Sequence, residues 1–267
     1  MNIIVTGASQ GIGYELVKYL SSIGSHNILA IARNRAQLEK LKKEINSLNT
    51  LSSIHILALD ISKDRSIELV YKYVNSSFSS IDILINNAGL LINKPFSKVS
   101  KRYVQEIFEI NLFSVINLIQ KMLPIMGKPQ THIVNIGSMG GFQGSSKFSG
   151  LSIYSASKAA LANLTECLAE ELKPQNVFVN CLALGAVQTE MLKNAFPGYN
   201  APVSASEIAV FIADFSLNGY KYINGKIIPV SLSTPWLDIQ KKHPKNFVEI
   251  KNPHTFATPL LTIEASS

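Results

Sequence analysis

Cysteine is scarce in this sequence: the 267 residues contain two, Cys167 and Cys181. Neither belongs to a CxxC pair, and no histidine cluster lies beside either of them. The sequence therefore contains no disulfide framework, and we predict no metal site. We expect both cysteines to be buried thiols in a reducing cytoplasm.

Long hydrophobic runs are also absent. No stretch approaches the roughly 18 to 20 uninterrupted apolar residues that a bilayer-spanning helix needs. The first strand-like run begins at Asn2, which leaves no room for a secretory signal. With 46% hydrophobic and 16% charged residues, the chain has enough apolar material for a buried core. We expect a cytoplasmic globular protein without a membrane partner.

Acidic residues are outnumbered by basic ones, 18 to 25, which gives a formal net charge of +7. The basic residues are spread along the chain, with short pairs such as Lys42-Lys43 and Lys241-Lys242. A nucleic-acid footprint is normally clustered. We therefore favour a solvated basic surface and expect no nucleic-acid partner, although a weak attraction for anionic small molecules fits the same charge.

Short, β-branched apolar runs alternate with amphipathic stretches of helical period over most of the chain. The expected strands are 2–6, 27–32, 54–59, 82–86, 132–136, 177–183 and 226–230. The expected helices are 11–24, 34–48, 64–77, 100–126, 153–173 and 204–217. Most of the strands are continuously apolar, as strands buried on both faces of a parallel sheet are. The pattern predicts an α/β fold, a single doubly wound Rossmann-type domain with a seven-stranded parallel sheet flanked by helices on both faces.

The last part of the chain differs in composition. Prolines at 235, 244, 253 and 259 interrupt each of its short apolar runs, so neither a helix nor a central strand fits. We expect one domain over residues 1–232 and an extended C-terminal tail over 233–267, whose role the sequence leaves open.

A glycine-rich turn follows the first expected strand, in the segment TGASQGIG. Glycines at 7, 11 and 13 allow close backbone approach, and the helix that starts there presents N–H groups to an anion. The GxxxGxG spacing matches neither the GxGxxG fingerprint nor a Walker loop. A tight strand-to-helix connection is the structural alternative, but the preceding strand and the following helix favour phosphate binding.

The residues at the ends of the second and third strands bear on the choice of cofactor. The second strand ends in AIARNR, with an arginine where NAD-binding folds often carry a carboxylate. A guanidinium suits a 2′-phosphate, so Arg33, with help from Asn34 and Arg35, favours NADP(H) over NAD(H). The alternative is a solvated arginine at a helix start. Asp60 could accept a hydrogen bond from the adenine amino group or could cap a helix or turn.

Tyr154 and Lys158 begin a helix four residues apart and therefore share one of its faces. A cation about 4 Å from a phenol, at an effective dielectric constant of about 20, contributes about 4 kcal/mol. We therefore expect Lys158 to lower the pKa of the phenol by at most about three units. An amphipathic helix with a surface tyrosine and lysine explains the pair equally well when it is considered alone. Ser138, at the end of the fifth strand, favours a catalytic role, because its hydroxyl could orient a carbonyl.

The ordered motifs TGxxxGIG, NNAG, Asn111, Ser138 and YxxxK resemble those of the short-chain dehydrogenase/reductase family. The resemblance covers residues 1–232. It implies a catalytic tetrad of Asn111, Ser138, Tyr154 and Lys158, in which the asparagine holds a water that connects the lysine to solvent. Together, the pattern and the resemblance predict cofactor contacts at Gly7, Ser9, Gln10, Gly11, Ile12, Gly13, Arg33, Asn34, Asp60, Ile61, Asn87, Ala88, Gly89, Tyr154, Lys158, Val187 and Thr189.

The sequence departs from the family pattern at three places. Leu184-Gly185 replaces the usual Pro-Gly, the segment between Ser138 and Tyr154 is slightly longer than usual, and the last strand lacks the usual Asp-Gly-Gly. The longer segment should border the substrate pocket. Four large apolar residues after Thr189 could form an apolar mouth, or could belong to the core or to an interface: Met191, Leu192, Phe196 and Tyr199.

The resemblance implies an NADP(H)-dependent oxidoreductase that interconverts a carbonyl and a secondary alcohol, similar to 3-oxoacyl or carbonyl reductases. The alternative is a catalytically weak NADP(H)-binding sensor or scaffold on the same fold. The expected partners are a small carbonyl or alcohol substrate and further copies of the chain, because the family is usually dimeric or tetrameric. The physiological substrate, the reaction direction and the strictness of the cofactor preference do not follow from the sequence.

Overall fold

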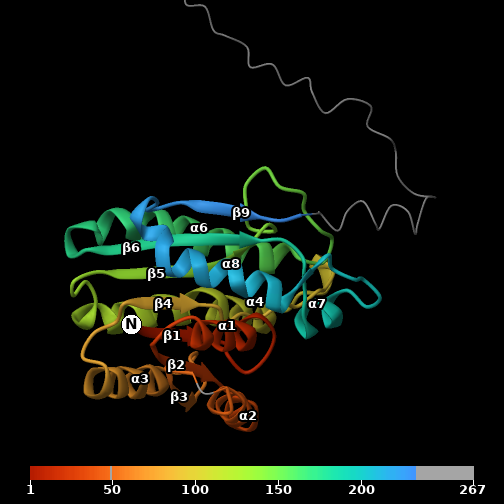
Figure 1. Ribbon diagram of the computed structural model, residues 1–267. Helices are drawn as coiled ribbons and strands as arrows, with labels where there is room; N and C mark the ends of the chain where they lie inside the picture. Colours follow the sequence, from red (N-terminus) through yellow and green to blue (C-terminus); the bar gives the residue numbers. More distant parts are fainter. Residues whose placement is uncertain (49, 233–267) are drawn as a thin grey trace, which may run out of the picture. The chain divides into compact units, whose positions relative to one another are not determined.

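The computed structural model describes residues 1–48 and 50–232, so the predicted tail 233–267 lies outside the described residues. The seven predicted strands form one parallel sheet (Figure 1). In spatial order they are β3 (Ser53–Ala58), β2 (Asn27–Ala32), β1 (Asn2–Thr6), β4 (Ile83–Asn86), β5 (Thr131–Ser138), β6 (Val177–Leu184) and β9 (Ile227–Val230). The strand order reverses between β1 and β4, where open α/β sheets bind their ligands. The predicted fold class is confirmed.

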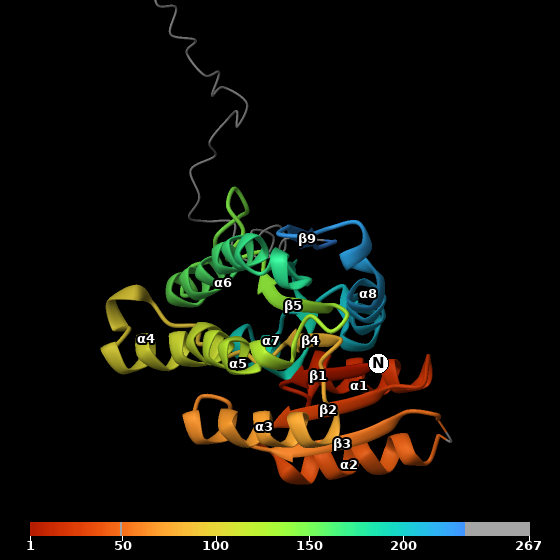
Figure 2. The same cartoon turned by 90° about the vertical axis from the view of Figure 1, so that its left-hand side faces the viewer.

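Helices cover both faces of the sheet. One face packs against α1 (Gly11–Ser22), α2 (Arg35–Asn46) and α8 (Ala205–Asn218). The opposite face packs against α3 (Asp64–Ser77), α5 (Ser114–Met122) and α6 (Ser152–Glu171). Figure 2 shows α1 and α8 on one side of the strands and α5 and α6 on the other. This arrangement buries the strands on both faces, as their continuous apolar runs predicted.

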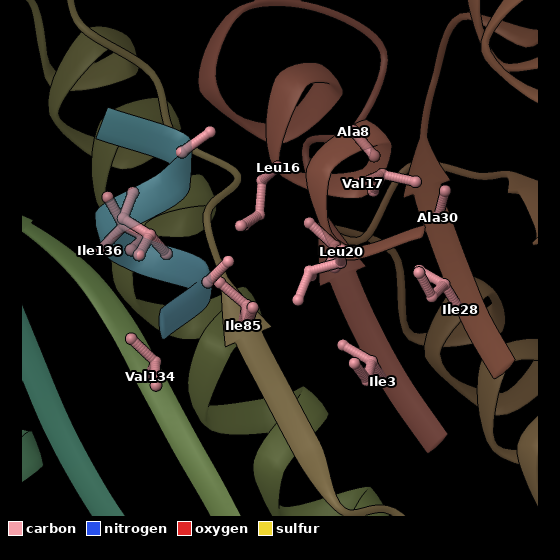
Figure 3. Packing of buried hydrophobic residues seen from close by; sticks show 14 of the residues in the cluster. Ile3, Ala8, Leu16, Val17, Leu20, Ile28, Ala30, Ile85, Val134 and Ile136 are labelled. Atoms are coloured by element: carbon pink, nitrogen blue, oxygen red, sulfur yellow. The ribbon is translucent and has the colours of Figure 1, made fainter. Parts of the chain in front are cut away.

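The central strands owe their position to apolar side chains on both faces. Ile3 and Ile28 point from neighbouring strands toward Leu16 and Leu20 of α1 (Figure 3). All four side chains are fully buried. On the other face Ile4 packs into the cluster formed with α3, α5 and α6. This packing fixes the carboxyl ends of the strands at one edge of the sheet, where the polar residues lie.

The predicted helix over 100–126 is wrong as a continuous α-helix. The structure divides it into α4 (Lys101–Phe108), a π-helical turn at Glu109–Phe113, α5 and a 3-10 turn at Leu123–Ile125. The turn residues include Asn111. Several short elements were not predicted: η1 (Phe96–Lys98), η4 (Lys173–Gln175), β7 (Val187–Gln188), α7 (Glu190–Ala195), β8 (Val203–Ser204) and η5 (Gly219–Lys221).

The expectation of two buried cysteines is half correct. Cys181 in β6 is buried, whereas Cys167 is exposed on α6. Helix α6 buries Leu161 and Ala169 against the sheet, so the intervening position 167 faces away from it. Among the residues described, no helix combines the length and the apolar character that crossing a membrane requires.

Candidate active site

The glycine turn after β1 brings the backbone of three segments close together. Gly7 and Gly11 have φ angles of 71° and 55°, which side-chain-bearing residues adopt at a cost. A Cβ on Gly7 would lie 2.8 Å from Ala88 Cα, and a Cβ on Gly13 would meet Gly7 O and lie 2.5 Å from Asn87 Nδ2. No side-chain hydrogen bond caps the N-terminus of α1. The turn therefore forms a backbone cradle at a helix N-terminus, which suits the pyrophosphate of a dinucleotide.

Thr6 and Asn87 hold this cradle in shape. The amide of Asn87 donates to Thr6 O at 2.9 Å and to Gly7 O at 3.2 Å. Thr6 Oγ1 accepts from the N–H groups of Asn87 and Ala88 at 3.1 and 3.0 Å. Asn87 thus joins the NNAG segment to the glycine turn. Thr6 was not among the predicted site residues, although it lies in the quoted TG motif.

The second edge of the site lies at the ends of β2 and β3. Burial alone would raise the pKa of Asp60, but hydrogen bonds from Ser62 and the charge of Arg33 outweigh it and lower that pKa. Ser62 Oγ and N lie 2.8 and 3.1 Å from Asp60 Oδ1. Asp60 is therefore an ionised acceptor whose pKa also responds to the charge of Arg33, with buried Ile61 beside it.

The two neighbours of Arg33 are engaged elsewhere. Asn34 Oδ1 accepts from Gln37 N at 3.1 Å and caps α2. Arg35 lies 3.8 Å from Glu39 in an exposed ion pair. These contacts argue against the predicted help of Asn34 and Arg35 in binding a phosphate. Of the three residues, Arg33 is the best placed to bind a phosphate.

Tyr154 and Lys158 lie inside the protein, on the first turns of α6. Only 9% of Tyr154 and 4% of Lys158 is exposed. Lys158 Nζ donates to Ile136 O at 2.8 Å. A Cβ on Gly89 would lie 3.5 Å from Lys158 Nζ and 3.4 Å from Asn111 Oδ1. The NNAG segment, the lysine and the asparagine therefore meet at one point, and burial rules out the alternative of a surface tyrosine and lysine.

The predicted lowering of the phenol pKa is not observed. Burial raises the pKa of Tyr154, and a hydrogen bond from Ser138 opposes that rise without reversing it. Burial also lowers the pKa of Lys158, to about 8. The expectation rested on nearby positive charge, chiefly that of the lysine, and omitted the desolvation of both groups, which is the larger effect here. The phenol is protonated at neutral pH, and so is most of the lysine.

Asn111 lies in the π-helical turn and is fully buried. Its Oδ1 accepts from Leu90 N at 2.7 Å, and its Nδ2 donates to Leu90 O at 2.9 Å and to Ser157 Oγ at 3.0 Å. Ser157 Oγ in turn donates to Tyr154 O at 2.7 Å. Asn111 thereby connects the segment after NNAG to the turn of α6 that carries Tyr154. Ser157 was not predicted as a site residue.

Ser138 ends β5, and its side chain is directed by the loop that follows. Gly140 N donates to Ser138 Oγ at 3.1 Å, and the hydroxyl also bonds to the Tyr154 phenol. A Cβ on Gly141 would lie 2.6 Å from Lys158 C, so the loop rests directly on α6. The four members of the predicted tetrad are brought together by β5, α6 and the π-helical turn.

The loop after β6 completes the site on its open side. Leu184 is the last residue of β6 and is paired with Ser138 and Val230. Here leucine continues the strand to its end, where the family usually carries proline. Thr189 Oγ1 caps α7 by accepting from Leu192 N at 3.2 Å, and Thr189 Cγ2 would lie 3.4 Å from a Cβ on Gly11.

The remaining predicted residues lie in these same segments. Ser9, Gln10 and Ile12 belong to the glycine turn and the start of α1, and Val187 begins β7. Figure 1 shows α7 on the side toward which the β6 arrow points. Met191, Leu192, Phe196 and Tyr199 are half-buried in and after α7. The structure thus places all of the predicted positions at the carboxyl edge of the sheet.

Comparisons with known proteins agree with this architecture. The short chain dehydrogenase family profile matches residues 1–200. A short-chain dehydrogenase of Penicillium roqueforti is 31% identical over 239 residues, which cover 85% of this chain and 92% of the relative. A 3-oxoacyl-[acyl-carrier-protein] reductase of Aquifex aeolicus is 29% identical and covers 85% and 94%.

A solved structure shares the fold at lower identity. L-sorbose reductase from Gluconobacter frateurii, complexed with NADPH and L-sorbose, superposes with a TM-score of 0.76 at 23% identity. The match covers 86% of this chain and 94% of that chain. Its identity is low enough that it supports the fold alone. The profile match, the relatives and the fold show that the chain belongs to the short-chain dehydrogenase/reductase family of oxidoreductases.

Proposed function

We propose that this protein is an NADP(H)-dependent reductase that converts a small carbonyl compound to a secondary alcohol. The observation that carries the proposal is the buried Tyr154–Lys158 pair, with Ser138 bonded to the phenol, at the same sheet edge as the glycine cradle. The likeness to a 3-oxoacyl-[acyl-carrier-protein] reductase supports the same reaction class.

The cofactor would lie across the sheet edge, held by residues that fit its parts. The cradle of Gly7, Gly11 and Gly13 suits the pyrophosphate, because any Cβ at position 7 or 13 would collide with the backbone of the site. Asp60 suits the adenine amino group and Arg33 suits a 2′-phosphate. When bound there, NADPH would supply the hydride that the carbonyl carbon accepts.

The side chains of this chain manage the proton and the orientation of the substrate. Ser138 donates a hydrogen bond to the carbonyl oxygen and stabilises the negative charge that develops there. Tyr154 gives its proton to the same oxygen. The proton is available because the raised pKa keeps the phenol protonated at neutral pH. Lys158 stabilises the phenolate that is left, because its ammonium group is buried on the same helical face.

The proposed substrate class rests on the relatives and on the rim of the site. We propose a 3-oxoacyl thioester or a simple ketone, which a mouth bordered by half-buried Met191, Leu192 and Phe196 would accept. NADPH oxidation is measured with 3-oxoacyl thioesters, ketones, aldehydes and ketoses, for the wild type and for Tyr154→Phe. We expect turnover with at least one thioester or ketone and a loss of at least about 100-fold in kcat for the variant. Equal turnover by both proteins would exclude the acid role of Tyr154, and NADPH binding without turnover across the panel would support the sensor alternative.

We also propose that the protein forms a homodimer or homotetramer through the outer faces of α4, α5 and α6. Phe113 and Cys167, which flank these faces, are both exposed in the single chain. Light scattering coupled to gel filtration measures the mass directly. Replacement of Phe113 by aspartate should reduce that mass if this surface is the interface.

A further inference from the structure

The loop between β5 and α6, residues 139–151, forms a compact turn beside the catalytic residues. Gly141 N donates to Ser138 O at 2.9 Å, and Phe142 N donates to Met139 O at 3.2 Å. The N–H of Gly140 points at Ser138 Oγ. Any movement of this turn therefore moves the donor that orients the Ser138 hydroxyl.

The exposed Lys147 bonds to three acceptors of this turn. Its Nζ donates to Gly140 O at 2.9 Å, to Phe142 O at 2.6 Å and to Ser145 Oγ at 2.9 Å. Ser145 Oγ also donates to Phe142 O at 2.8 Å and contacts Met139 O. A lysine ammonium has three N–H donors, and all three are used on acceptors of one loop.

Lys147 bonds to atoms of its own loop instead of to a carboxylate. Within residues 1–48 and 50–232, none of the ion pairs involves Lys147. Two of its three acceptors are backbone carbonyl oxygens, which attract an ammonium strongly through charge-assisted hydrogen bonds. One of them belongs to Gly140, the residue that bonds to Ser138. The charge of Lys147 is thus used to hold the backbone of the loop.

The far end of the loop is anchored separately. Lys94 N donates to Gly150 O at 2.9 Å, and Gly150, with a φ of 83°, lies against Asn93. Asn93 Nδ2 donates to Ala195 O at the end of α7 at 2.8 Å. With both ends of the loop attached, the bonds of Lys147 and Ser145 hold its middle in shape.

We infer that Lys147 is a positioning residue of the active site: its ammonium group holds the β5–α6 loop so that Gly140 N–H directs the Ser138 hydroxyl at the substrate carbonyl. The inference rests on the proposed reduction of a carbonyl. A Ser138 hydroxyl that accepts from Gly140 N–H keeps its own O–H as a donor. That O–H bonds to the Tyr154 phenol here and would serve a substrate oxygen beside it, and a directed donor acts mainly in the transition state. Loss of Lys147 should therefore lower kcat and leave KM nearly unchanged.

A double-mutant cycle tests this coupling. The wild type, Lys147→Met, Ser138→Ala and the double variant are assayed with NADPH and the best carbonyl substrate. We expect Lys147→Met to lower kcat about tenfold in the wild type and less than about twofold in the Ser138→Ala background. Additive losses would show that Lys147 does not act through Ser138. A rise of KM alone, restored by Lys147→Arg, would show that the lysine attracts an anionic substrate, and would also overturn the inference.

The matched control is Lys173→Met, which removes the same charge from an exposed lysine before β6, at the opposite edge of the sheet. Its kcat and KM should equal those of the wild type. Amide hydrogen exchange of the 139–151 peptides supplies a readout that needs no turnover. We expect about tenfold faster exchange in Lys147→Met and no change in Lys173→Met, and unchanged exchange in Lys147→Met would overturn the inference. A wild type without turnover would contradict the proposed function, whereas the exchange rates would still decide whether Lys147 holds the loop.

Discussion

At the scale of single residues, the site contains two ionisable groups whose pKa values are shifted by burial. Tyr154 and Lys158 are both buried, and burial disfavours the charged form of each. The lysine keeps a hydrogen bond to Ile136 O, which helps to retain its ammonium form inside the protein. The pair therefore combines a protonated phenol with a cation that is ready to stabilise its conjugate base.

The pH dependence of reduction follows from the Lys158 pKa. Because that pKa is lowered to about 8, the ammonium form is present below about pH 8 and is lost above it. We expect kcat/KM for carbonyl reduction to fall about tenfold per pH unit above that value, since this ratio reports the free enzyme. Initial rates between pH 6 and 10 measure it. A profile that stays flat to pH 10 would show that the lysine charge is not required.

The proposed preference for NADP(H) rests on Arg33. We expect Arg33→Ala to weaken NADPH binding by about 10- to 100-fold, because a charge-assisted contact to the 2′-phosphate is lost. NADH binding should change by less than about threefold. Dissociation constants from cofactor fluorescence compare the two, with Arg35→Ala as the control, since Arg35 pairs with Glu39. Equal losses for both cofactors would contradict the assignment to the 2′-phosphate.

At the scale of elements, the helical segment between β4 and β5 is interrupted by a π-helical turn at the asparagine of the site. The π-helical turn at Glu109–Phe113 turns Asn111 inward, where Leu90 and Ser157 bond to it. Ser114 Oγ donates to Ile110 O at 2.8 Å, which satisfies a carbonyl at the irregular turn. The sequence of this segment contains neither proline nor glycine, so the irregularity depends on partners from other elements.

The glycine turn is the second element whose shape is set by close approach. The φ of Gly13 is not in the left-handed region, yet its missing side chain leaves room for Gly7 O and Asn87 Nδ2. We expect Gly13→Ala to abolish measurable NADPH binding and to destabilise the fold by about 1 to 3 kcal/mol through overpacking. Thermal unfolding with and without NADPH separates the two effects.

The control for this variant is Gly144→Ala. Gly144 has a φ of 78°, and a Cβ there would meet nothing within 4 Å. It should cost about 1 kcal/mol in stability through backbone strain, with NADPH binding unchanged. NADPH binding by Gly13→Ala that matches the wild type would contradict the cradle.

At the scale of the whole molecule, the sheet buries a histidine whose titration is coupled to folding. His132 of β5 is 1% exposed. Its Nδ1 lies 2.9 Å from Ser216 O and its Nε2 lies 3.1 Å from Asn180 Nδ2, so only the neutral ring satisfies both partners. Burial lowers its pKa to about 4. His132 therefore joins β5, β6 and α8 through a ring that must stay neutral.

This histidine predicts a loss of stability in mild acid. The pKa of the folded state lies below the ordinary value near 6.5, so the stabilisation is complete above that value and is lost as the pH falls from about 6.5 toward 4. We expect His132 to account for up to about 3 kcal/mol of this loss. Urea unfolding at pH 7.0 and 4.5 measures it in the wild type and in His132→Gln. The variant should be less stable at pH 7 but should lose less stability on acidification; equal losses would contradict the role of His132.

Much of the fold could be predicted because each element carries a local pattern. The continuous apolar runs define all seven strands of the main sheet, and they end within two residues of their predicted limits. The short β7, β8 and α7 could not be predicted, because they are too brief for a period to show. Thr6 and Ser157 were missed for another reason: their importance depends on partners about 80 and 46 residues away in the chain.

The sequence by itself determined the parallel sheet, the order of its motifs and the residues that meet at its carboxyl edge, because apolar periodicity and the glycine turn act locally. Only the tertiary structure decided the charge of those residues and the path of the backbone around them. Burial, which raises the pKa of Tyr154 and lowers that of Lys158, depends on the atoms packed from other elements. The π-helical turn at Asn111 and the loop closed by Lys147 likewise depend on hydrogen bonds between side chains and distant or non-periodic backbone, which no local pattern encodes.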